Sequence, residues 1–198
     1  MSTGILLSGG MDSIAVAWWK RPSVALNIHY GQASARGELR AAQAVCSALG
    51  MALEVLEVDC RSLGSGTLAQ SPPLPSAPVP EWWPFRNQLL LTLAAMRAVA
   101  IGVDCLLLGT VSTDSVHRDG TESFVSDMDR AMSQQEGAIR VQAPAIRMNT
   151  EELIRASGVP RSLLGWAHSC HMGEVACGVC RGCRKYMAVS AQLLWVAE

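Results

Sequence analysis

The feature that most constrains this chain is an apolar run that stops abruptly at two glycines. Residues 4–7 are Gly-Ile-Leu-Leu, and they lead directly into Ser8, Gly9, Gly10, Met11, Asp12 and Ser13. This pattern predicts a buried strand, a tight turn and a helix that starts near Asp12 and Ser13. Glycines allow a positive φ and a close approach of a ligand, while the first helical turn offers free amide groups. The sequence therefore predicts a phosphate-binding turn.

The order of residues in this turn distinguishes between classes of phosphate-binding loop. No lysine follows the glycines and the spacing is short, which excludes the nucleoside-triphosphate loop that ends in Gly-Lys-Ser or Gly-Lys-Thr. The segment Ser-Gly-Gly-Met-Asp-Ser at 8–13 instead resembles the pyrophosphate loop of the ATP pyrophosphatases. That resemblance implies cleavage of ATP between its α and β phosphates, transfer of AMP to a substrate oxygen, and pyrophosphate held on the loop. A glycine-rich turn without a ligand is the alternative.

Composition limits the class of protein further. The chain has 198 residues, of which 49% are hydrophobic, and its net charge is −1, so we expect one globular domain with a buried core. The balanced charge gives no reason to expect a stable nucleic-acid partner. No segment reaches the roughly 18 apolar residues that span a bilayer, and the N-terminus carries no leader pattern. We therefore expect a cytoplasmic protein without a membrane partner.

Hydrophobic periodicity predicts alternating strands and helices. Apolar runs predict strands at residues 4–7, 24–28, 53–58, 103–109 and 139–142, the third with one wetter face. Apolar residues three or four apart predict helices at residues 13–19, 33–49, 86–101, 121–133 and 149–156. This alternation is typical of a Rossmann-like α/β fold, a parallel sheet with helices on both faces and ligands at the carboxyl ends of its strands.

One long segment has neither period. Residues 61–80 contain two glycines and five prolines, and each proline removes a backbone donor, so neither a helix nor a central strand fits. The segment is a long loop, either an inert surface excursion or a mobile cover over the active site.

Four of the seven cysteines lie close together near the C-terminus. Their spacing is C-x6-C-x2-C-x2-C, at Cys170, Cys177, Cys180 and Cys183. Four thiolates at such intervals can surround one ion, and the pattern favours structural Zn²⁺ with no coordination position left open for catalysis. An iron–sulfur cluster is the alternative. His168 and His171 lie close enough to replace a cysteine or to support the site.

Taken in order along the chain, these motifs resemble the QueC family, the 7-cyano-7-deazaguanine synthases of the queuosine pathway. Besides the loop and the cysteines, the matching segments are Tyr30-Gly31-Gln32, Arg86-Asn87, Gly109, Asp119, Glu122-Ser123-Phe124, Ala143-Pro144 and Ser169-Cys170. The loop alone indicates only the superfamily. The cysteine set together with Arg-Asn indicates QueC, and the match runs through nearly the whole chain.

The resemblance implies an adenine nucleotide α-hydrolase-like domain at residues 1–165. Residues 166–198 would form a zinc knuckle and a C-terminal helix packed on the same domain, and the assembly would be a homodimer. The implied chemistry is ATP-dependent adenylation of the carboxylate of 7-carboxy-7-deazaguanine, with Mg²⁺ bridging phosphate oxygens. Ammonia would then give the amide, and a second activation would give the nitrile 7-cyano-7-deazaguanine.

The resemblance also implies roles for individual residues. Pyrophosphate would lie on Ser8, Gly9, Gly10, Met11 and Ser13. Asp12 would cap the helix or help to place Mg²⁺, and it is the first of two expected catalytic residues. The second is Arg86, which would neutralise phosphate or acyl-adenylate charge, and a surface ion pair is its structural alternative.

The deazaguanine would be held by a second group of residues, namely Tyr30, Gln32, Arg86, Asn87 and Asp119. Asp119 would accept hydrogen bonds from the amidine edge of the base. An aspartate before a glycine is otherwise a turn former.

The chain departs from the family pattern near this substrate site. His29 stands where the family usually has aspartate, and Phe85 stands where it usually has glycine. The chain is also short, with a compressed first cysteine gap. One alternative is therefore a QueC-like enzyme of anti-phage operons that conjugates the activated deazaguanine to a protein amine such as an N-terminus. The others are a ligase that thiolates a tRNA base and a non-catalytic zinc-containing binding module.

Overall fold

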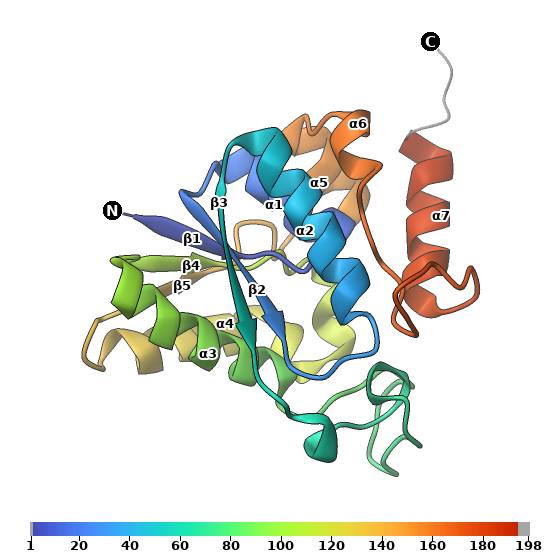
Figure 1. Cartoon of the computed structure of the whole chain (residues 1–198), viewed down its shortest axis with the longest axis horizontal. Helices are drawn as coiled ribbons and strands as arrows, with labels where there is room; N and C mark the ends of the chain where they lie inside the picture. The colour runs from blue at the N-terminus through green and yellow to red at the C-terminus, as the bar shows by residue number, and fades with distance from the viewer. Residues whose placement is uncertain (1, 194–198) are drawn as a thin grey trace.

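The computed structural model describes residues 2–193, and the last five residues of the predicted 166–198 segment lie outside them. Five parallel strands form one sheet in the order β3-β2-β1-β4-β5. The strands are β1 (Thr3–Leu6), β2 (Val24–His29), β3 (Ala52–Glu57), β4 (Cys105–Leu107) and β5 (Arg140–Gln142). The predicted Rossmann-like parallel sheet is confirmed, and Figure 1 shows its arrangement.

Helices cover both faces of this sheet, as the sequence predicts. They are α1 (Met11–Lys20), α2 (Ala35–Leu49), α3 (Arg86–Ile101), α4 (Glu122–Ser133), α5 (Thr150–Ser157), α6 (Arg161–Leu164) and α7 (Arg181–Leu193). Alternate residues of β1 face opposite sides: Ile5 joins a core with α1, α2 and α5, while Leu6 packs against a core with α3 and α4. None of the helices within residues 2–193 is long and apolar enough to cross a bilayer.

The element boundaries differ from the predicted ones in two places that matter for the site. Helix α1 begins at Met11 rather than Ser13, because Gly10 is extended (ψ 159°) and acts as the N-cap residue. The predicted strand at 103–109 is shorter, since only Cys105–Leu107 pair on both sides within the sheet. The earlier start of α1 shortens the turn after β1 to residues 7–10, while the shorter β4 lengthens the irregular backbone at the carboxyl end of the sheet, where ligands bind in this fold class.

The position of β3 at the edge of the sheet explains its mixture of apolar and acidic residues. It pairs with β2 alone and its residues are half-buried or exposed. Glu54 in this strand accepts hydrogen bonds from Arg97 of α3, with 2.8 Å between Arg97 Nη2 and Glu54 Oε2. Leu53 packs against one core and Leu56 against the other, so the strand has no single wetter face as predicted, and its exposure follows from its place at the edge of the sheet.

The proline-rich segment 61–80 is a loop with two short 3₁₀ helices, Arg61–Leu63 and Thr67–Ala69. It is anchored by a small core in which Leu68 and Trp83 pack with Tyr30 and Cys60. The rings of Tyr30 and Trp83 meet edge to face with 4.9 Å between their centroids. The loop is thus packed against the carboxyl end of β2, next to the predicted substrate site.

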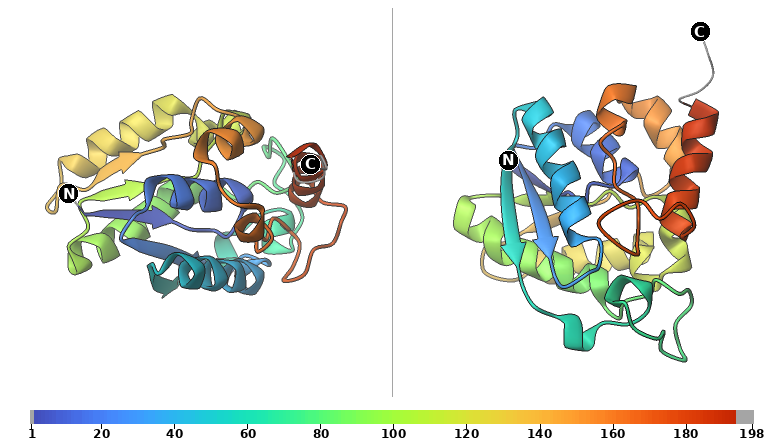
Figure 2. Two further views of the ribbon diagram at one scale, coloured as in Figure 1. Left: turned by 90° about the horizontal axis from the view of Figure 1, so that it is seen from above. Right: turned by 45° about the vertical axis from the view of Figure 1, so that its right-hand side comes forward.

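Helix α7 stands apart from the helices of the sheet. Both views of Figure 2 show it at the edge of the molecule away from the N-terminus. It follows residues 165–180, which we call the cysteine-containing loop. Its buried residues Gly182, Cys183, Val189 and Ser190 face the domain. The 3₁₀ helices and the short helix α6 were not predicted, because a single turn leaves no periodic signal.

Candidate active site

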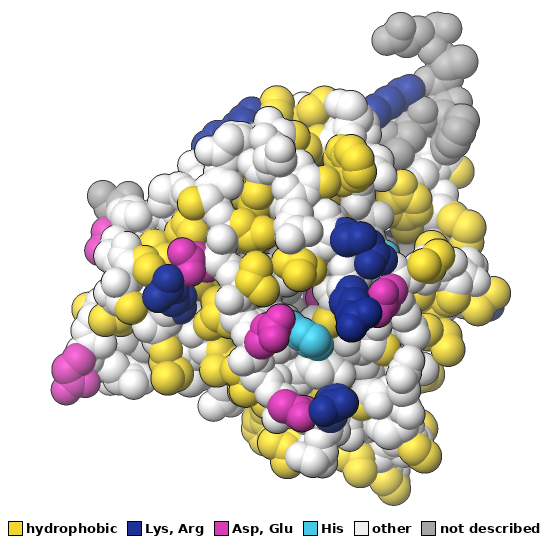
Figure 3. Space-filling model, viewed as in Figure 1, with side chains coloured by type: hydrophobic (Ala, Val, Ile, Leu, Met, Phe, Trp, Pro, Cys, Tyr) yellow, Lys and Arg dark blue, Asp and Glu magenta, His cyan; other side chains and the backbone are white. Residues whose placement is uncertain are grey.

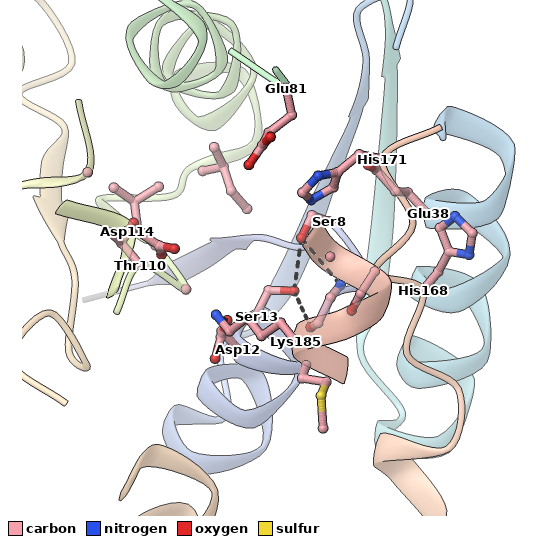
Figure 4. Close-up of a pocket in the computed structure, with 18 of the residues that line it drawn as sticks. Ser8, Asp12, Ser13, Glu38, Glu81, Thr110, Asp114, His168, His171 and Lys185 are labelled. Atoms are coloured by element: carbon pink, nitrogen blue, oxygen red, sulfur yellow. Dashed lines mark hydrogen bonds and ion pairs between the residues drawn. The ribbon is translucent and has the colours of Figure 1, made fainter. Parts of the chain in front are cut away.

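A cavity of about 560 Å³ lies at the carboxyl ends of β1, β2 and β4. The phosphate loop forms its floor, and the first residues of α3, the 112–120 segment, the cysteine-containing loop and α7 form its walls. Figure 4 shows Asp12 and Ser13 on one side of this space, with Glu81 across it. The structure therefore places the predicted loop at the ligand-binding edge expected for the fold.

The loop holds two hydroxyls together beside the start of α1. Gly9 has a φ of 78°, and a Cβ there would lie 2.7 Å from the Cβ of Ala41. Ser13 Oγ donates to the carbonyl of Gly10 at 2.9 Å and lies 3.2 Å from Ser8 Oγ. The first intrahelical bond runs from Ile14 N to Gly10 O, so the amides of the first turn of α1 are directed towards the cavity end. Hydroxyls and amides on one side of a cavity suit an anion.

Asp12 forms an ion pair across the loop with a residue from the far end of the chain. Lys185 Nζ lies 2.8 Å from Asp12 Oδ2, while Asp12 Oδ1 is buried without a hydrogen-bond partner. Burial raises the pKa of the Asp12 carboxyl above its ordinary value, and the charge of Lys185 opposes this shift. The hydroxyl of Thr150, also buried and unpartnered, belongs to the same corner of the cavity. These unused oxygens can take a ligand or a cation.

Tyr30 and Arg86 also line the cavity. Burial raises the pKa of Tyr30, with Arg86 opposing that shift. Burial also lowers the pKa of Arg86, but Tyr30, Asp119 and other acidic neighbours more than offset it, and the net shift is upwards. The guanidinium is therefore charged and held against the phenol inside the cavity.

Gln32 lies behind Tyr30 rather than on the cavity surface. Its Oε1 accepts from Tyr30 N at 2.9 Å, and its Nε2 donates to Ile28 O and to Glu38 Oε2. The side chain is 3% exposed. Gln32 thus fixes the turn after β2, and its predicted contact with substrate stays a prediction.

Asn87 and Asp119 hold the start of α3. Asn87 N donates to Asp119 Oδ2 at 3.1 Å, and Asn87 Nδ2 donates to Asp119 O at 2.7 Å. Asn87 lines the cavity, whereas Asp119 is not one of its lining residues. Asp119 therefore acts as a capping group for α3, and its predicted contact with the deazaguanine stays a prediction.

Several cavity residues had no signal in the sequence. Glu81 is 6% exposed, and its Oε1 accepts from Arg181 Nη1 at 3.2 Å. His117 and His171 lie near this pair, and burial lowers the pKa of both imidazoles. Together with Lys185, these residues come from the loop before α3, from the 112–120 segment and from the C-terminal region. Sequence distance concealed that they share one cavity, since His171, Arg181 and Lys185 lie in or near the cysteine motif, far along the chain from Glu81 and His117.

The four cysteines form a second site next to this cavity. Their sulfurs all lie within 4.8 Å of one another, and Cys177 Sγ and Cys183 Sγ are 3.9 Å apart. A tetrahedron with metal–sulfur bonds of about 2.3 Å has sulfur–sulfur edges of about 3.8 Å. The backbone amides of Val179 and Cys180 lower the pKa of Cys177 to about 6, while burial raises that of Cys183 to about 12. The geometry fits one metal ion.

The two nearby histidines are directed elsewhere. His168 Nε2 lies 3.0 Å from Gly173 O, and a Cβ on Gly37 would lie 2.5 Å from the same ring nitrogen. A Cβ on Gly182 would overlap Ser169 O and lie 2.8 Å from His171 Nε2. The histidines pack around the metal-binding loop and line the cavity, and the four-sulfur set is complete without them.

His29 and Phe85, which depart from the family pattern, do not line the cavity. The main chain of His29, at the end of β2, accepts a bond from Val58 N. Phe85 is 76% exposed and has a φ of 55°, a conformation that favours glycine. Its neighbour Arg86 does line the cavity, so the exposed ring lies on the surface next to the site.

Charge on the molecular surface is mixed. Arg36 and Arg40 both lie 3.6 Å from Glu174 of the cysteine-containing loop. Figure 3 shows basic and acidic side chains next to one another, with hydrophobic side chains between them. The face drawn in Figure 3 therefore carries charges of both signs.

Comparison with known proteins places these features in a family. The family model for queuosine biosynthesis protein QueC matches residues 3–189. A 7-cyano-7-deazaguanine synthase from Nitratiruptor sp. is 30% identical over 206 residues, which cover 93% of this chain and 91% of the relative. One from Ralstonia nicotianae is 33% identical over 201 residues, which cover 91% and 89%.

Among solved structures, the chain is similar to the U34-tRNA thiolase NcsA from Methanococcus maripaludis, determined with its 4Fe-4S cluster. The TM-score is 0.56 at 13% identity, and the match covers 98% of this chain and 66% of that chain. At this identity the likeness bears on the fold alone.

Proposed function

Since this chain belongs to the QueC family, we propose that it is an ATP-dependent ligase that adenylates the carboxylate of 7-carboxy-7-deazaguanine and passes the acyl group to ammonia. The observation that carries the proposal is the shared cavity. The residues of the phosphate loop line it, and so do Arg86 and Asn87 at the start of α3. ATP and a planar acid can therefore meet within one cavity.

The proposed reaction has four steps. A carboxylate oxygen attacks the α phosphorus of ATP, and pyrophosphate leaves on the loop. Ammonia attacks the acyl carbon, AMP departs with its bridging oxygen, and the amide remains. The amide oxygen then attacks the α phosphorus of a second ATP and a second pyrophosphate leaves. The nitrogen loses its two protons as AMP departs with the former amide oxygen, which gives the nitrile.

The chain's own residues would position and neutralise the reacting groups. The hydroxyls of Ser8 and Ser13 and the first-turn amides, with Gly9, Gly10 and Met11 shaping the turn, would hold pyrophosphate. Arg86, kept charged beside Tyr30, would neutralise the acyl-adenylate. Tyr30, Asn87 and the supporting pair Gln32 and Asp119 would define the base site.

The residues present fit the metals that this chemistry implies. Asp12 Oδ1, buried and unpartnered, would hold Mg²⁺, which would supply positive charge to neutralise the phosphates. Cys170, Cys177, Cys180 and Cys183 would hold Zn²⁺ as a structural ion. We also expect a homodimer, as the family resemblance implies.

The test is product formation from purified protein. ATP, Mg²⁺, 7-carboxy-7-deazaguanine and ammonia should yield the nitrile by mass spectrometry, with pyrophosphate released. Asp12→Asn should abolish pyrophosphate release. Asp127→Asn, which removes an exposed carboxylate paired with Arg130 on α4, should leave it unchanged. Equal release from Asp12→Asn and wild type would contradict the proposal.

A second acceptor is favoured by one observation, the exposed Phe85 beside Arg86. An amine carried on a protein would touch the surface at this point, as in the anti-phage conjugation reaction. Intact-mass analysis of candidate acceptor proteins would show the added deazaguanine acyl group. A nitrile product with no protein adduct would rule this acceptor out.

A further inference from the structure

The phosphate loop lacks a cation of its own. Within residues 4–13 the single charged side chain is Asp12, which is acidic. Pyrophosphate on such a loop gains from hydroxyls and amides, but its charge needs a basic side chain nearby. Among the described residues that line the cavity, the basic ones other than histidine are Arg86, Arg181 and Lys185.

Two of these three cations are engaged away from the loop. Arg86 lies against Tyr30, which follows β2. Arg181 donates to Glu81, which is buried before α3. Lys185, one helical turn after Arg181 on α7, is the cation that contacts the loop itself.

The placement of Lys185 suits a ligand of the loop. Its Nζ lies 2.8 Å from Asp12 Oδ2, and its side chain is 35% exposed. Figure 4 shows it beside Asp12 and Ser13, with its end at the loop. An ammonium has three donors, so one bond to Asp12 leaves two that can reach another acceptor. Asp12 thus holds the ammonium where the phosphates would lie.

We propose that Lys185 is a phosphate-binding residue that supplies from helix α7 the positive charge that the loop sequence lacks. It donates to the pyrophosphate group of ATP while Asp12 keeps it in place. The inference depends on the proposed function in one respect, that ATP phosphates lie on this loop.

The test is a binding measurement with inorganic pyrophosphate and with ATP, using calorimetry on the full chain. Lys185→Met should weaken the Kd for pyrophosphate roughly 10- to 100-fold, the loss expected for one hydrogen bond to a charged group. Lys185→Arg should restore most of the affinity. Arg184→Met removes a charge from the neighbouring exposed position outside the cavity and should bind as wild type does.

A purely structural role, in which Lys185 only neutralises Asp12, makes a different prediction. Asp12→Asn removes the need for neutralisation, so Lys185→Met would then have no further effect in the Asp12→Asn background. We expect the double variant to bind pyrophosphate more weakly than Asp12→Asn alone. The double variant also removes the unpaired buried carboxylate, so it keeps the test valid if Lys185→Met alone does not fold.

Unchanged affinity in Lys185→Met, or equal affinity of the double and the Asp12→Asn variants, would overturn the inference. Its failure differs from failure of the proposed function. Pyrophosphate binding that depends on Lys185, without any deazaguanine product, would retain the lysine and reject the ligase.

Discussion

Replacement of Gly109 by alanine tests whether the end of β4 fixes the phosphate loop. A Cβ at Gly109 would lie 2.6 Å from Ser13 Cα and 2.8 Å from Ser13 N, where ordinary contact begins at 3.4 Å. These are backbone atoms, so no rotamer change relieves the contact. The strand end and the first turn of α1 must separate by 0.8 Å, the difference between 2.6 and 3.4 Å.

Two measurements should respond to this displacement. Overpacking of this kind costs about 1–3 kcal/mol in the free energy of unfolding. Pyrophosphate should bind roughly 10- to 100-fold more weakly, since one charge-assisted bond from the displaced turn is worth about 1.5–3 kcal/mol. Urea unfolding measures the first quantity and calorimetry measures the second.

Gly50→Ala is the matched control. Gly50 has a φ of 63° at the end of α2, with nothing within 4 Å of a Cβ there. A left-handed alanine costs about 1 kcal/mol, so this variant should lose stability without losing pyrophosphate affinity. If Gly109→Ala bound pyrophosphate as tightly as Gly50→Ala, the turn before α1 would not be the anion site.

Three further predictions follow from the site. Burial raises the pKa of Asp12 above its ordinary 3.8, so the folded state binds this proton more tightly than the unfolded state does. The free energy of unfolding should therefore fall as pH rises from 3.8 through the raised pKa. Urea titrations across pH should show that Asp12→Asn lacks this fall. Elemental analysis should find one zinc per chain. Cys183→Ser should lose both the zinc and the affinity for pyrophosphate, because the cysteine site positions α7. Iron, with absorption in the visible range, would contradict zinc. Asp119→Ala should lower the free energy of unfolding by about 1 kcal/mol, because it uncaps α3. Asp119→Asn keeps an acceptor oxygen for this cap. A loss of deazaguanine affinity in Asp119→Asn would therefore assign the base contact to Asp119, and unchanged affinity would exclude it.

The fold was largely predictable because its signals are local. The break from apolar strand to glycines at residue 9, and periodic runs such as 86–101, each specify an element within a short window. The family was also predictable from ordered motifs, and the family match confirms it. The cluster of four cysteines followed from their spacing and is found in the structure.

The cavity walls were much less predictable. Glu81 has no motif around it, while Arg181 and Lys185 lie in or just after the cysteine motif. That motif predicts a metal site but not which cavity the two basic side chains face, because this depends on how the cysteine-containing loop packs beside the sheet. Gln32 illustrates the converse. It belongs to a motif, yet its side chain forms hydrogen bonds with Tyr30, Ile28 and Glu38 and does not face the cavity. A motif therefore locates a segment, while tertiary packing decides which of its side chains face a ligand.

The pairing of Asp12 with Lys185 also has a consequence for synthesis of the chain. The two residues are 173 positions apart. At a translation rate of about 5–20 residues per second, the loop leaves the peptidyl-transferase centre roughly 10–30 s before its lysine. A nascent chain would thus present the acidic loop without its lysine throughout that interval, and the loop would gain its positive charge only after helix α7 is made.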